Sequence, residues 1–220
     1  MANNLIIYYS RRGQNYWNGS IRSLEKGNTE IVAEFIQKAV GGDLFQIETV
    51  KEYAADYMTC TEEAQAELRA KARPELKRYL EDISGYDNVF VCGPCWWGTF
   101  PMAVLSQLER LDFSGKKVFA VMTHEGSGQA GSERTLRELC KGASIGKGIA
   151  SHGAEAAESE AKVAAWAQKS VRDDDKNKRR IFHAGYTHLH PSNTAWQPTR
   201  DAADAHGPCH GGRARDGRTR

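Results

Sequence analysis

Residues 88–101 read NVFVCGPCWWGTFP, and this stretch decides the fold. Its first five residues are mostly apolar, which is typical of a strand covered on both faces of a parallel sheet. Gly93-Pro94 ends that strand. Pro101 suits the first turn of a helix, and the apolar residues after it follow helical spacing. One strand, one loop and one helix therefore form a unit, which the rest of the chain repeats.

The same alternation extends outward on both sides of this unit. Strands are expected at residues 5–9, 44–50, 88–92 and 117–122, with a weak fifth strand at 149–150. Helices are expected at residues 29–40, 61–82 with an interruption or restart at Pro74, 101–111, 132–140 and 159–170. Asn28 or Thr29 can cap the first helix, and Gly41-Gly42 ends it. Repeated strand–helix units predict an α/β fold with a parallel sheet and helices on both faces.

The charge distribution divides the chain into two parts. The 220 residues carry 30 basic and 28 acidic side chains, a net charge of +2. Residues 1–170 hold 20 basic and 22 acidic side chains, whereas residues 171–220 hold ten and six. The first part therefore has a net charge of −2 and the second part +4. We expect a folded domain over residues 1–170 and a separate basic tail over residues 171–220.

Residues 171–220 contain too few apolar side chains to form a core. Val171, Ile181, Phe182 and Leu189 are the only Val, Ile, Leu or Phe among them, so burial cannot offset the entropy of ordering. We expect this tail to be disordered. A nucleic-acid-binding arm and a His/Cys zinc site are the alternatives, but the histidines and Cys209 lack a recognised ligand spacing. Neither nucleic acid nor a metal ion is therefore expected as a ligand.

The cysteines and the hydropathy pattern indicate the cellular compartment. Five cysteines are scattered along the chain, and an odd number suits a reduced cytoplasmic protein better than a disulfide-stapled one. No apolar run reaches about 18 residues, so no membrane span is expected. Residues 1–4 lack the basic start of a secretory signal. We therefore expect a cytoplasmic protein with no membrane partner.

Three loops of unusual composition follow the expected strands, at residues 10–28, 93–100 and 123–131. Ligands of such sheets bind beyond the carboxyl ends of the strands, where the strand order reverses. The first loop begins with SRRG at residues 10–13 and ends with GNT at residues 27–29. Hydroxyls, an amide and glycines at a helix N-terminus can bind a phosphate; ordinary helix capping is the alternative. Neither a Walker loop nor a dinucleotide-binding GxGxxG is present.

The second and third loops suit an aromatic ring. In the second loop, Trp96 and Trp97 point in different directions, so one can pack in the core while the other offers its flat face to a ring. The third loop reads THEGSG at residues 123–128. Its glycines let the backbone approach a ligand, and its hydroxyls and amides can hydrogen-bond a polar ring edge. Core packing and a flexible loop are the respective alternatives, but together the three loops favour a ligand site.

These motifs, in this order, resemble those of the flavodoxin family, in particular flavodoxin-like proteins with a Trp-Trp-Gly-Thr loop. The resemblance covers about residues 3–169. It is carried by YYSR at residues 8–11, GNT at 27–29, WWGTxP at 96–101 and THxGSG at 123–128. The resemblance implies a three-layer α/β sandwich with a five-stranded parallel sheet in the order 2-1-3-4-5, and FMN as the cofactor.

The resemblance also implies which residues contact the FMN. Its phosphate would be held by Ser10, Arg11, Asn28 and Thr29. Its isoalloxazine ring would be flanked, with a tryptophan stacked on it, by Pro94, Cys95, Trp96, Trp97 and Gly98. The polar edge of the ring would be lined by Thr123, His124, Gly126, Ser127 and Gly128. Relative to a typical flavodoxin, residues 12–26 form an insertion, whose Tyr16 and Trp17 can fold over the flavin, dock a partner or pack on the domain.

Residues 92–95 read CGPC, the redox motif of thioredoxins. Thioredoxin chemistry needs the first cysteine exposed at a helix N-terminus, where its pKa falls. Cys92 instead ends an apolar strand, and a tryptophan pair follows instead of a helix. We therefore expect no catalytic dithiol.

Three functions fit these motifs. The first expectation is an FMN electron carrier between redox protein partners, because the cofactor supplies the redox chemistry and the protein tunes it. The alternative is an FMN-dependent oxidoreductase that uses NAD(P)H to reduce quinones or nitro compounds. Such an enzyme needs open space over the flavin, which Tyr16, Trp17 and His124 could line, and His124 could give a proton. A flavodoxin-fold module without FMN is the third, and no catalytic residue is assigned.

Overall fold

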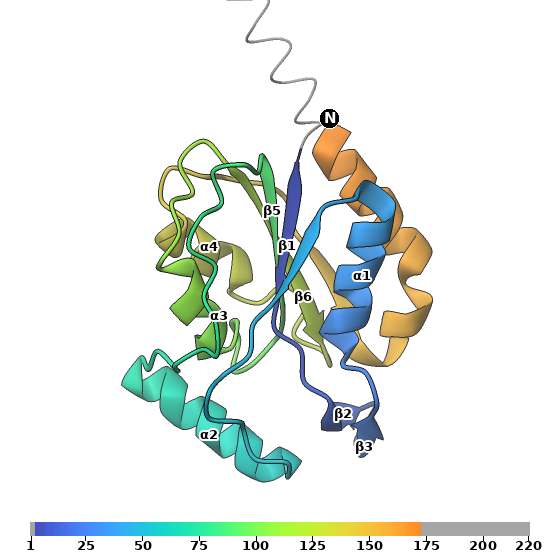
Figure 1. The fold of residues 1–220 in the computed structure, drawn as a ribbon. Coiled ribbons are helices and arrows are strands. Elements are labelled where there is room, and N and C mark those ends of the chain that lie inside the picture. Colours follow the sequence, from blue (N-terminus) through green and yellow to red (C-terminus); the bar gives the residue numbers. More distant parts are fainter. Residues whose placement is uncertain (1–2, 173–220) are drawn as a thin grey trace, which may run out of the picture.

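The computed structural model describes residues 3–172, in which helices cover both faces of a central parallel sheet (Figure 1). Apart from Val171 and Arg172, the expected tail over residues 171–220 lies outside the described residues. None of the helices in the described part is long and apolar enough to cross a membrane.

The central sheet has the strand order expected from the resemblance. Its parallel strands are β4 (Asp43–Gln46), β1 (Asn4–Tyr8), β5 (Asn88–Pro94), β6 (Lys117–His124), β7 (Ser144–Ile145) and β8 (Ile149–His152). The hydrogen-bonded order is β4-β1-β5-β6-β7, and β8 pairs with the carboxyl-terminal half of β6. Because β7 and β8 share the place of the fifth strand, the order 2-1-3-4-5 and the flavodoxin-like α/β fold are confirmed.

Helices form a layer on each face of the sheet. One face is covered by α1 (Asn28–Val40) and by the helical residues 160–172, and the other by α3 (Met102–Leu108) and α4 (Ser132–Leu139) (Figure 1). The strands supply alternate side chains to the two buried clusters between these layers. In β5, Val89 and Val91 belong to the cluster under α3, whereas Phe90 and Cys92 belong to the cluster under α1. This two-sided burial explains the nearly continuous apolar run at residues 88–92.

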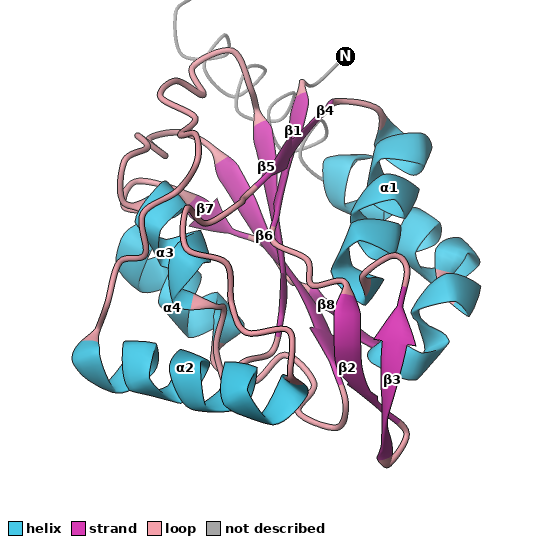
Figure 2. Ribbon diagram, turned by 60° about the horizontal axis from the view of Figure 1, so that its bottom comes forward, coloured by secondary structure: helices cyan, strands magenta, loops and turns pink. Residues whose placement is uncertain are grey.

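Two further elements lie at the carboxyl-terminal edge of the sheet. β2 (Gly13–Trp17) and β3 (Ser20–Leu24) form an antiparallel hairpin within the segment between β1 and α1 (Figure 2). Helix α2 (Tyr57–Ala70) lies at the same end of the molecule (Figure 1). A short 3-10 helix, η1 (Gly153–Glu158), follows β8. The hairpin and α2 therefore flank the edge at which the three loops were expected to bind a ligand.

The helix expected at residues 61–82 is wrong at both ends. The helix in the structure, α2, spans Tyr57–Ala70. It begins at Tyr57 because the Asp56 side chain caps it by accepting from the backbone N–H of Thr59 at 2.9 Å. It ends before Lys71, which has a left-handed φ of 50°. Residues 71–82 contain no helix, so Pro74 does not restart one.

Three other local expectations differ from the structure. The strand expected at residues 44–50 ends at Gln46, and Thr49 forms only an isolated bridge with Leu76. The first helix is capped by Gly27 rather than by Asn28 or Thr29. The first loop, over residues 10–28, is largely the β2–β3 hairpin, for which no strands were predicted.

Candidate functional site

The N-terminus of α1 presents free hydrogen-bond donors at the carboxyl edge of the sheet. The backbone N–H of Glu30 donates to Ser10 Oγ at 3.0 Å. The backbone N–H groups of Asn28 and Thr29 have no acceptor among residues 3–172. Free N–H groups at the positive end of a helix are a binding site for an anion. The hydroxyls of Thr29 and Thr123 are 2.7 Å apart, which joins this helix end to the carboxyl end of β6.

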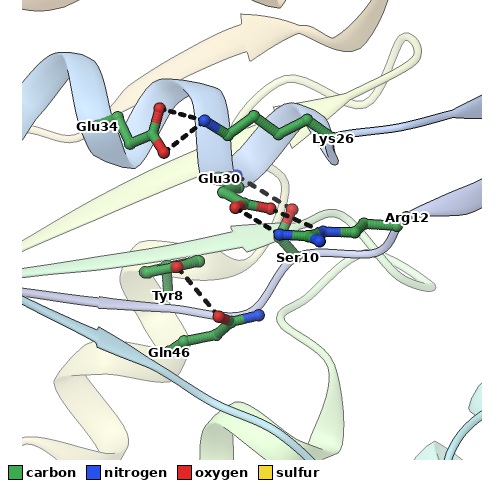
Figure 3. A network of polar contacts seen from close by, with 7 residues as sticks. All are labelled: Tyr8, Ser10, Arg12, Lys26, Glu30, Glu34 and Gln46. Atoms are coloured by element: carbon green, nitrogen blue, oxygen red, sulfur yellow. Dashed lines mark hydrogen bonds and ion pairs between the residues drawn. The ribbon is translucent and has the colours of Figure 1, made fainter.

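Two ion pairs fasten the ends of the hairpin segment to α1 (Figure 3). The guanidinium of Arg12 donates to the Glu30 carboxylate at 2.8 and 3.3 Å, and Lys26 pairs with Glu34. Glu30 is buried, so its charge is compensated mainly by Arg12. Because Arg12 is engaged with a carboxylate, Arg11 remains as the arginine that lines the site.

Arg11 is held in place by backbone carbonyls. Its Nε donates to Gln14 O at 3.0 Å, and its Nη2 donates to Ala54 O and Ala55 O at 2.9 Å each. These bonds tie the start of the hairpin to the segment before α2. Arg11 lines the site while its Nε and Nη2 are hydrogen-bonded to backbone carbonyls.

The tryptophan loop is a tight turn. Trp96 and Thr99 exchange backbone hydrogen bonds at 2.9 and 3.1 Å. The residues between them, Trp97 and Gly98, have φ values of 51° and 83°. Positive φ at both central residues defines a type I′ turn, which glycine adopts easily and tryptophan rarely. The structure thus holds Trp97 in an unusual conformation, as residues at functional sites often are.

This turn gives the two tryptophans opposite environments. Trp96 packs edge to face against Tyr9 and Tyr53, with ring centroids 5.4 and 5.0 Å apart. Trp97 is 51% exposed, and its Nε1 donates to Thr61 O in α2 at 2.9 Å. One tryptophan therefore packs against the core while the other keeps an open face at the site.

The carboxyl end of β6 and the loop that follows it are both hydrogen-bonded to the tryptophan loop. The backbone N–H of Cys95 donates to Thr123 O at 2.8 Å, and that of Gly131 donates to Gly98 O at 2.9 Å. His124 Nδ1 accepts from the backbone N–H of Gly126 at 2.9 Å. Burial, and next the neighbouring His152, lower the pKa of His124. Both effects favour the neutral imidazole of His124 and so disfavour it as a proton donor.

Glu125 brings an incompletely paired carboxylate to the same place. Its Oε2 accepts from the backbone N–H of Asn18 in the hairpin turn at 3.2 Å and lies 3.6 Å from His152 Nε2. Its Oε1 is buried without a hydrogen-bond partner in the described part of the chain. Both this oxygen and Asn28 Nδ2 lie beside Gly153, where a Cβ would overlap them. An anionic oxygen is thus held next to the N-terminus of α1.

Two adjoining cavities open at this edge of the sheet. The polar cavity, of about 110 Å³, surrounds the N-terminus of α1. The hairpin cavity, of about 580 Å³, extends between the β2–β3 hairpin and α2 and reaches Trp97. The two cavities share the wall residues Arg11, Asn15, Tyr16, Tyr57, Cys95 and Trp96.

The polar cavity brings together eight of the residues expected to contact a cofactor, namely Arg11, Asn28, Thr29, Pro94, Cys95, Trp96, Thr123 and His124. Trp97 lines the hairpin cavity instead. Five further residues line neither of these cavities: Ser10, Gly98, Gly126, Ser127 and Gly128. Of these, Ser10 and Gly98 still shape the site, because they accept the backbone hydrogen bonds of Glu30 and Gly131.

Several lining residues were not predicted, notably Asn15, Tyr57, Glu125 and Gly153. A sequence signal for the hairpin did exist. Asn18-Gly19 stands between apolar and aromatic residues, and this pair favours a type I′ hairpin turn. In the structure Asn18 and Gly19 have φ values of 45° and 85°, as that turn requires. Tyr57 has no comparable signal, because its place depends on where α2 begins.

Cys92 is fully buried in β5, and this burial raises the pKa of its thiol. Only the thiolate of a cysteine is nucleophilic, so Cys92 is inert. The buried position of Cys92 is unlike the exposed first cysteine that a thioredoxin-like dithiol at residues 92–95 would need. The cysteines of the described chain, Cys60, Cys92, Cys95 and Cys140, are all free thiols.

The chain matches the family model described as flavodoxin over residues 23–170. The protein therefore belongs to the flavodoxin family. Among solved structures it is similar to two proteins described as flavoproteins. The one from Bacteroides uniformis is 26% identical, with a TM-score of 0.59, over 76% of this chain and 98% of that chain. The one from Bacteroides eggerthii is 25% identical, with a TM-score of 0.60, over 78% of this chain and 99% of that chain.

A flavoprotein from Lactobacillus acidophilus, solved in complex with FMN, is 19% identical to this chain. Its TM-score is 0.49, over 68% of this chain and 93% of that chain. No curated protein matches the chain.

Proposed function

We propose that this protein binds FMN and carries electrons between redox partners. The observation that supports this proposal is the polar cavity, where eight residues expected from the family motifs meet at the N-terminus of α1. FMN supplies the electron-transfer chemistry when bound. The residues of the chain would bind the cofactor, orient its ring and shield it from water.

The N-terminus of α1 fits the phosphate of FMN. The free backbone N–H groups of Asn28 and Thr29 and the helix dipole favour an anion at this position. Gly27 leaves no room for a side chain, because a Cβ there would overlap Ser10 Oγ and Arg11 O. Arg11 adds a positive charge to the cavity wall.

The tryptophan turn and the loop after β6 fit the flavin ring. Trp96 and Cys95 lie on the wall between the two cavities, and Trp97 keeps an exposed indole face beside them. Thr123, whose hydroxyl contacts that of Thr29 at the helix end, and His124 also line the polar cavity. These residues would contact the ring and its polar edge.

The partners of the carrier would be redox proteins of the cytoplasm, where the free thiols of the described residues would stay reduced. An FMN-dependent oxidoreductase using NAD(P)H is the second candidate function. The hairpin cavity favours it, because such an enzyme needs open space beside the flavin. A carrier needs no such space.

Titration of the purified apoprotein with FMN tests the proposal. We expect quenching of flavin fluorescence at a stoichiometry of one FMN per chain, followed by reversible reduction in an anaerobic redox titration. Failure to bind FMN would refute the proposed function. Steady oxidation of NAD(P)H by the holoprotein, without a protein partner, would favour the second candidate over the carrier.

Replacing Glu125 by glutamine is expected to tighten FMN binding by about threefold to tenfold. The unpaired Oε1 beside Asn28 repels a phosphate at this helix end. Two unit charges about 4 Å apart interact by about 1 kcal/mol in water and more at a partly buried site, and about 1.4 kcal/mol corresponds to tenfold in affinity. The measurement is an FMN titration of Glu125→Gln at low and high salt, where salt should reduce the difference.

The matched control for this prediction is Glu138→Gln, which removes the same charge from an exposed position on α4. Its FMN affinity should equal that of the wild type. Weaker binding by Glu125→Gln would contradict the prediction and would mean that the carboxylate accepts a hydrogen bond from the cofactor.

A further inference from the structure

We propose that His152 sets how strongly the N-terminus of α1 binds the phosphate of FMN, because its protonated imidazole compensates the charge of Glu125. This inference rests on the proposed FMN site and concerns the pH dependence of that site. His152 ends β8, directly before η1, and lines neither of the two cavities. It is therefore a positioning residue, which acts on the cofactor through a neighbouring carboxylate.

Two carboxylates lie at the N-terminus of α1, and they differ in how their charge is compensated. Glu30 is paired with Arg12. Glu125 forms no ion pair with Lys or Arg in the described part of the chain, and its Oε1 is buried without a hydrogen-bond partner there. A Cβ on Gly153 would lie 2.5 Å from that oxygen and 2.6 Å from Asn28 Nδ2, so the carboxylate is a neighbour of the first residue of α1. Because like charges repel, it opposes a phosphate at this helix end.

His152 is the partner of this carboxylate that can gain a positive charge. Its Nε2 lies 3.6 Å from Glu125 Oε2. The side chain of Glu125 is 18% exposed and that of His152 is 30% exposed, so solvent screens this pair less than a pair on the open surface. Histidine is the side chain whose charge changes near neutral pH. Protonation of His152 would therefore compensate a full negative charge beside the helix end.

The neighbouring His124 is a poorer candidate for this proton. β6 and β8 place the two histidines opposite each other, with ring centroids 5.7 Å apart, so charging one ring disfavours charging the other. His124 Nδ1 accepts from the backbone N–H of Gly126, and protonation of that nitrogen would break this bond. His152 Nδ1 has no hydrogen-bond partner among the described residues, so protonation there breaks none. The geometry therefore favours His152 as the ring that takes the proton.

The other charges around the two rings have opposite signs. After burial and His152, the groups that affect the pKa of His124 are Glu125, Lys162 and Glu155. Glu155 belongs to η1, and Lys162 belongs to the helical residues 160–172. Of these groups, Glu125 is the one that forms an ion pair with His152. The carboxylate that opposes the phosphate is thus also the charge that pairs with the protonated imidazole.

This arrangement fixes the direction of the pH effect. At acid pH the protonated His152 pairs with Glu125, and the phosphate of FMN meets a neutral pair. At alkaline pH His152 is neutral, and the charge of Glu125 opposes the phosphate. The phosphate itself titrates near about pH 6, so its own effect is removed only when variants are compared at the same pH.

FMN titrations of the wild type, His152→Gln and His152→Lys at about pH 5.5 and about pH 8 test the inference. Glutamine is neutral and lysine is charged at both pH values. The wild type should bind FMN about threefold more tightly than His152→Gln at the acid pH and equally at the alkaline pH. His152→Lys should bind FMN about threefold more tightly than the wild type at the alkaline pH. Damage to the fold cannot produce this gain, so it separates the charge from a structural role.

The matched control is Ser144→Lys, which adds the same charge at an exposed position in β7, opposite the amino end of β6. Its FMN affinity should equal that of the wild type at both pH values. A gain as large as that of His152→Lys would overturn the inference, because any added positive charge would then serve. Equal FMN affinities of the wild type and His152→Gln at the acid pH would overturn it as well.

A Glu125→Gln background tests whether His152 acts through this carboxylate. In that background, His152→Gln should change FMN affinity at the acid pH by less than about 1.5-fold, since no charge is left to compensate. A full threefold effect would overturn the proposed route.

Absence of FMN binding in the wild type would overturn the proposed function, and inorganic phosphate would then be titrated into the same apoproteins. The same pH-dependent difference between wild type and His152→Gln would support the role of His152 without FMN. Its absence would overturn this inference too.

Discussion

Replacing Gly27 by alanine is expected to weaken FMN binding by roughly tenfold to a hundredfold. The backbone of Gly27 has φ of −72° and ψ of 146°, which any residue can adopt, so only the added Cβ matters. That Cβ would lie well under 3.0 Å from both Ser10 Oγ and Arg11 O. Because one of these contacts is a backbone atom, the connection between β1 and α1 must move. Overpacking of this kind typically costs about 1–3 kcal/mol. We expect this cost to be larger in the FMN-bound protein, whose phosphate needs the α1 N-terminus in place, and a difference of this size corresponds to the expected loss of affinity.

The measurement is the dissociation constant of FMN for the wild type, for Gly27→Ala and for Gly85→Ala. Gly85 is exposed, and a Cβ there would meet no atom within 4 Å, so it controls for the loss of a glycine. Gly85→Ala should bind FMN like the wild type. An unchanged affinity in Gly27→Ala would show that the phosphate does not bind at the N-terminus of α1.

The sheet could be predicted because its strands are buried on both faces. Buried strands such as β5 and β6 carry nearly continuous apolar runs, and these runs are visible in one sequence. The ends of α2 could not be predicted in the same way. Its cap depends on Asp56 and its end on a left-handed Lys71, and neither residue type is rare elsewhere in the chain. The helix therefore begins and ends at these local caps, and Pro74 does not start a second helix.

The part of the candidate site that lies at the carboxyl ends of the strands could be predicted from the sequence. Thr29 and Thr123, far apart in sequence, meet because β1 and β6 both end at this edge. The partners of Arg11 and Glu125 were not predictable, because they depend on how the hairpin folds back over the edge. The hairpin also forms one wall of the hairpin cavity. The Asn18-Gly19 pair indicates the hairpin turn, but no motif in the sequence indicates the cavity.

Replacing Phe90 by alanine is expected to destabilise the protein by about 3–5 kcal/mol. Phe90 is fully buried in β5 and stacks on Phe119 of β6, with ring centroids 5.0 Å apart. Trp166, from the helical residues 160–172, packs edge to face on both rings at 5.7 and 5.9 Å. Its Nε1 donates to Lys147 O at 3.1 Å, which fixes the indole in place. Removing the Phe90 ring leaves a cavity that this fixed cluster cannot readily fill.

Urea unfolding measures this effect as a lower midpoint with an unchanged slope. A domain is typically stable by about 5–15 kcal/mol, so the loss is a large part of the total. Val50→Ala, at an exposed position, should change the free energy of unfolding by less than about 0.5 kcal/mol. The folded Phe90→Ala protein should still bind FMN within about threefold of the wild type, whereas Gly27→Ala should lose affinity instead. A loss below about 1 kcal/mol in Phe90→Ala would mean that Trp166 and residues 160–172 move into the space, and that this face of the sheet is not closed by a rigid aromatic cluster.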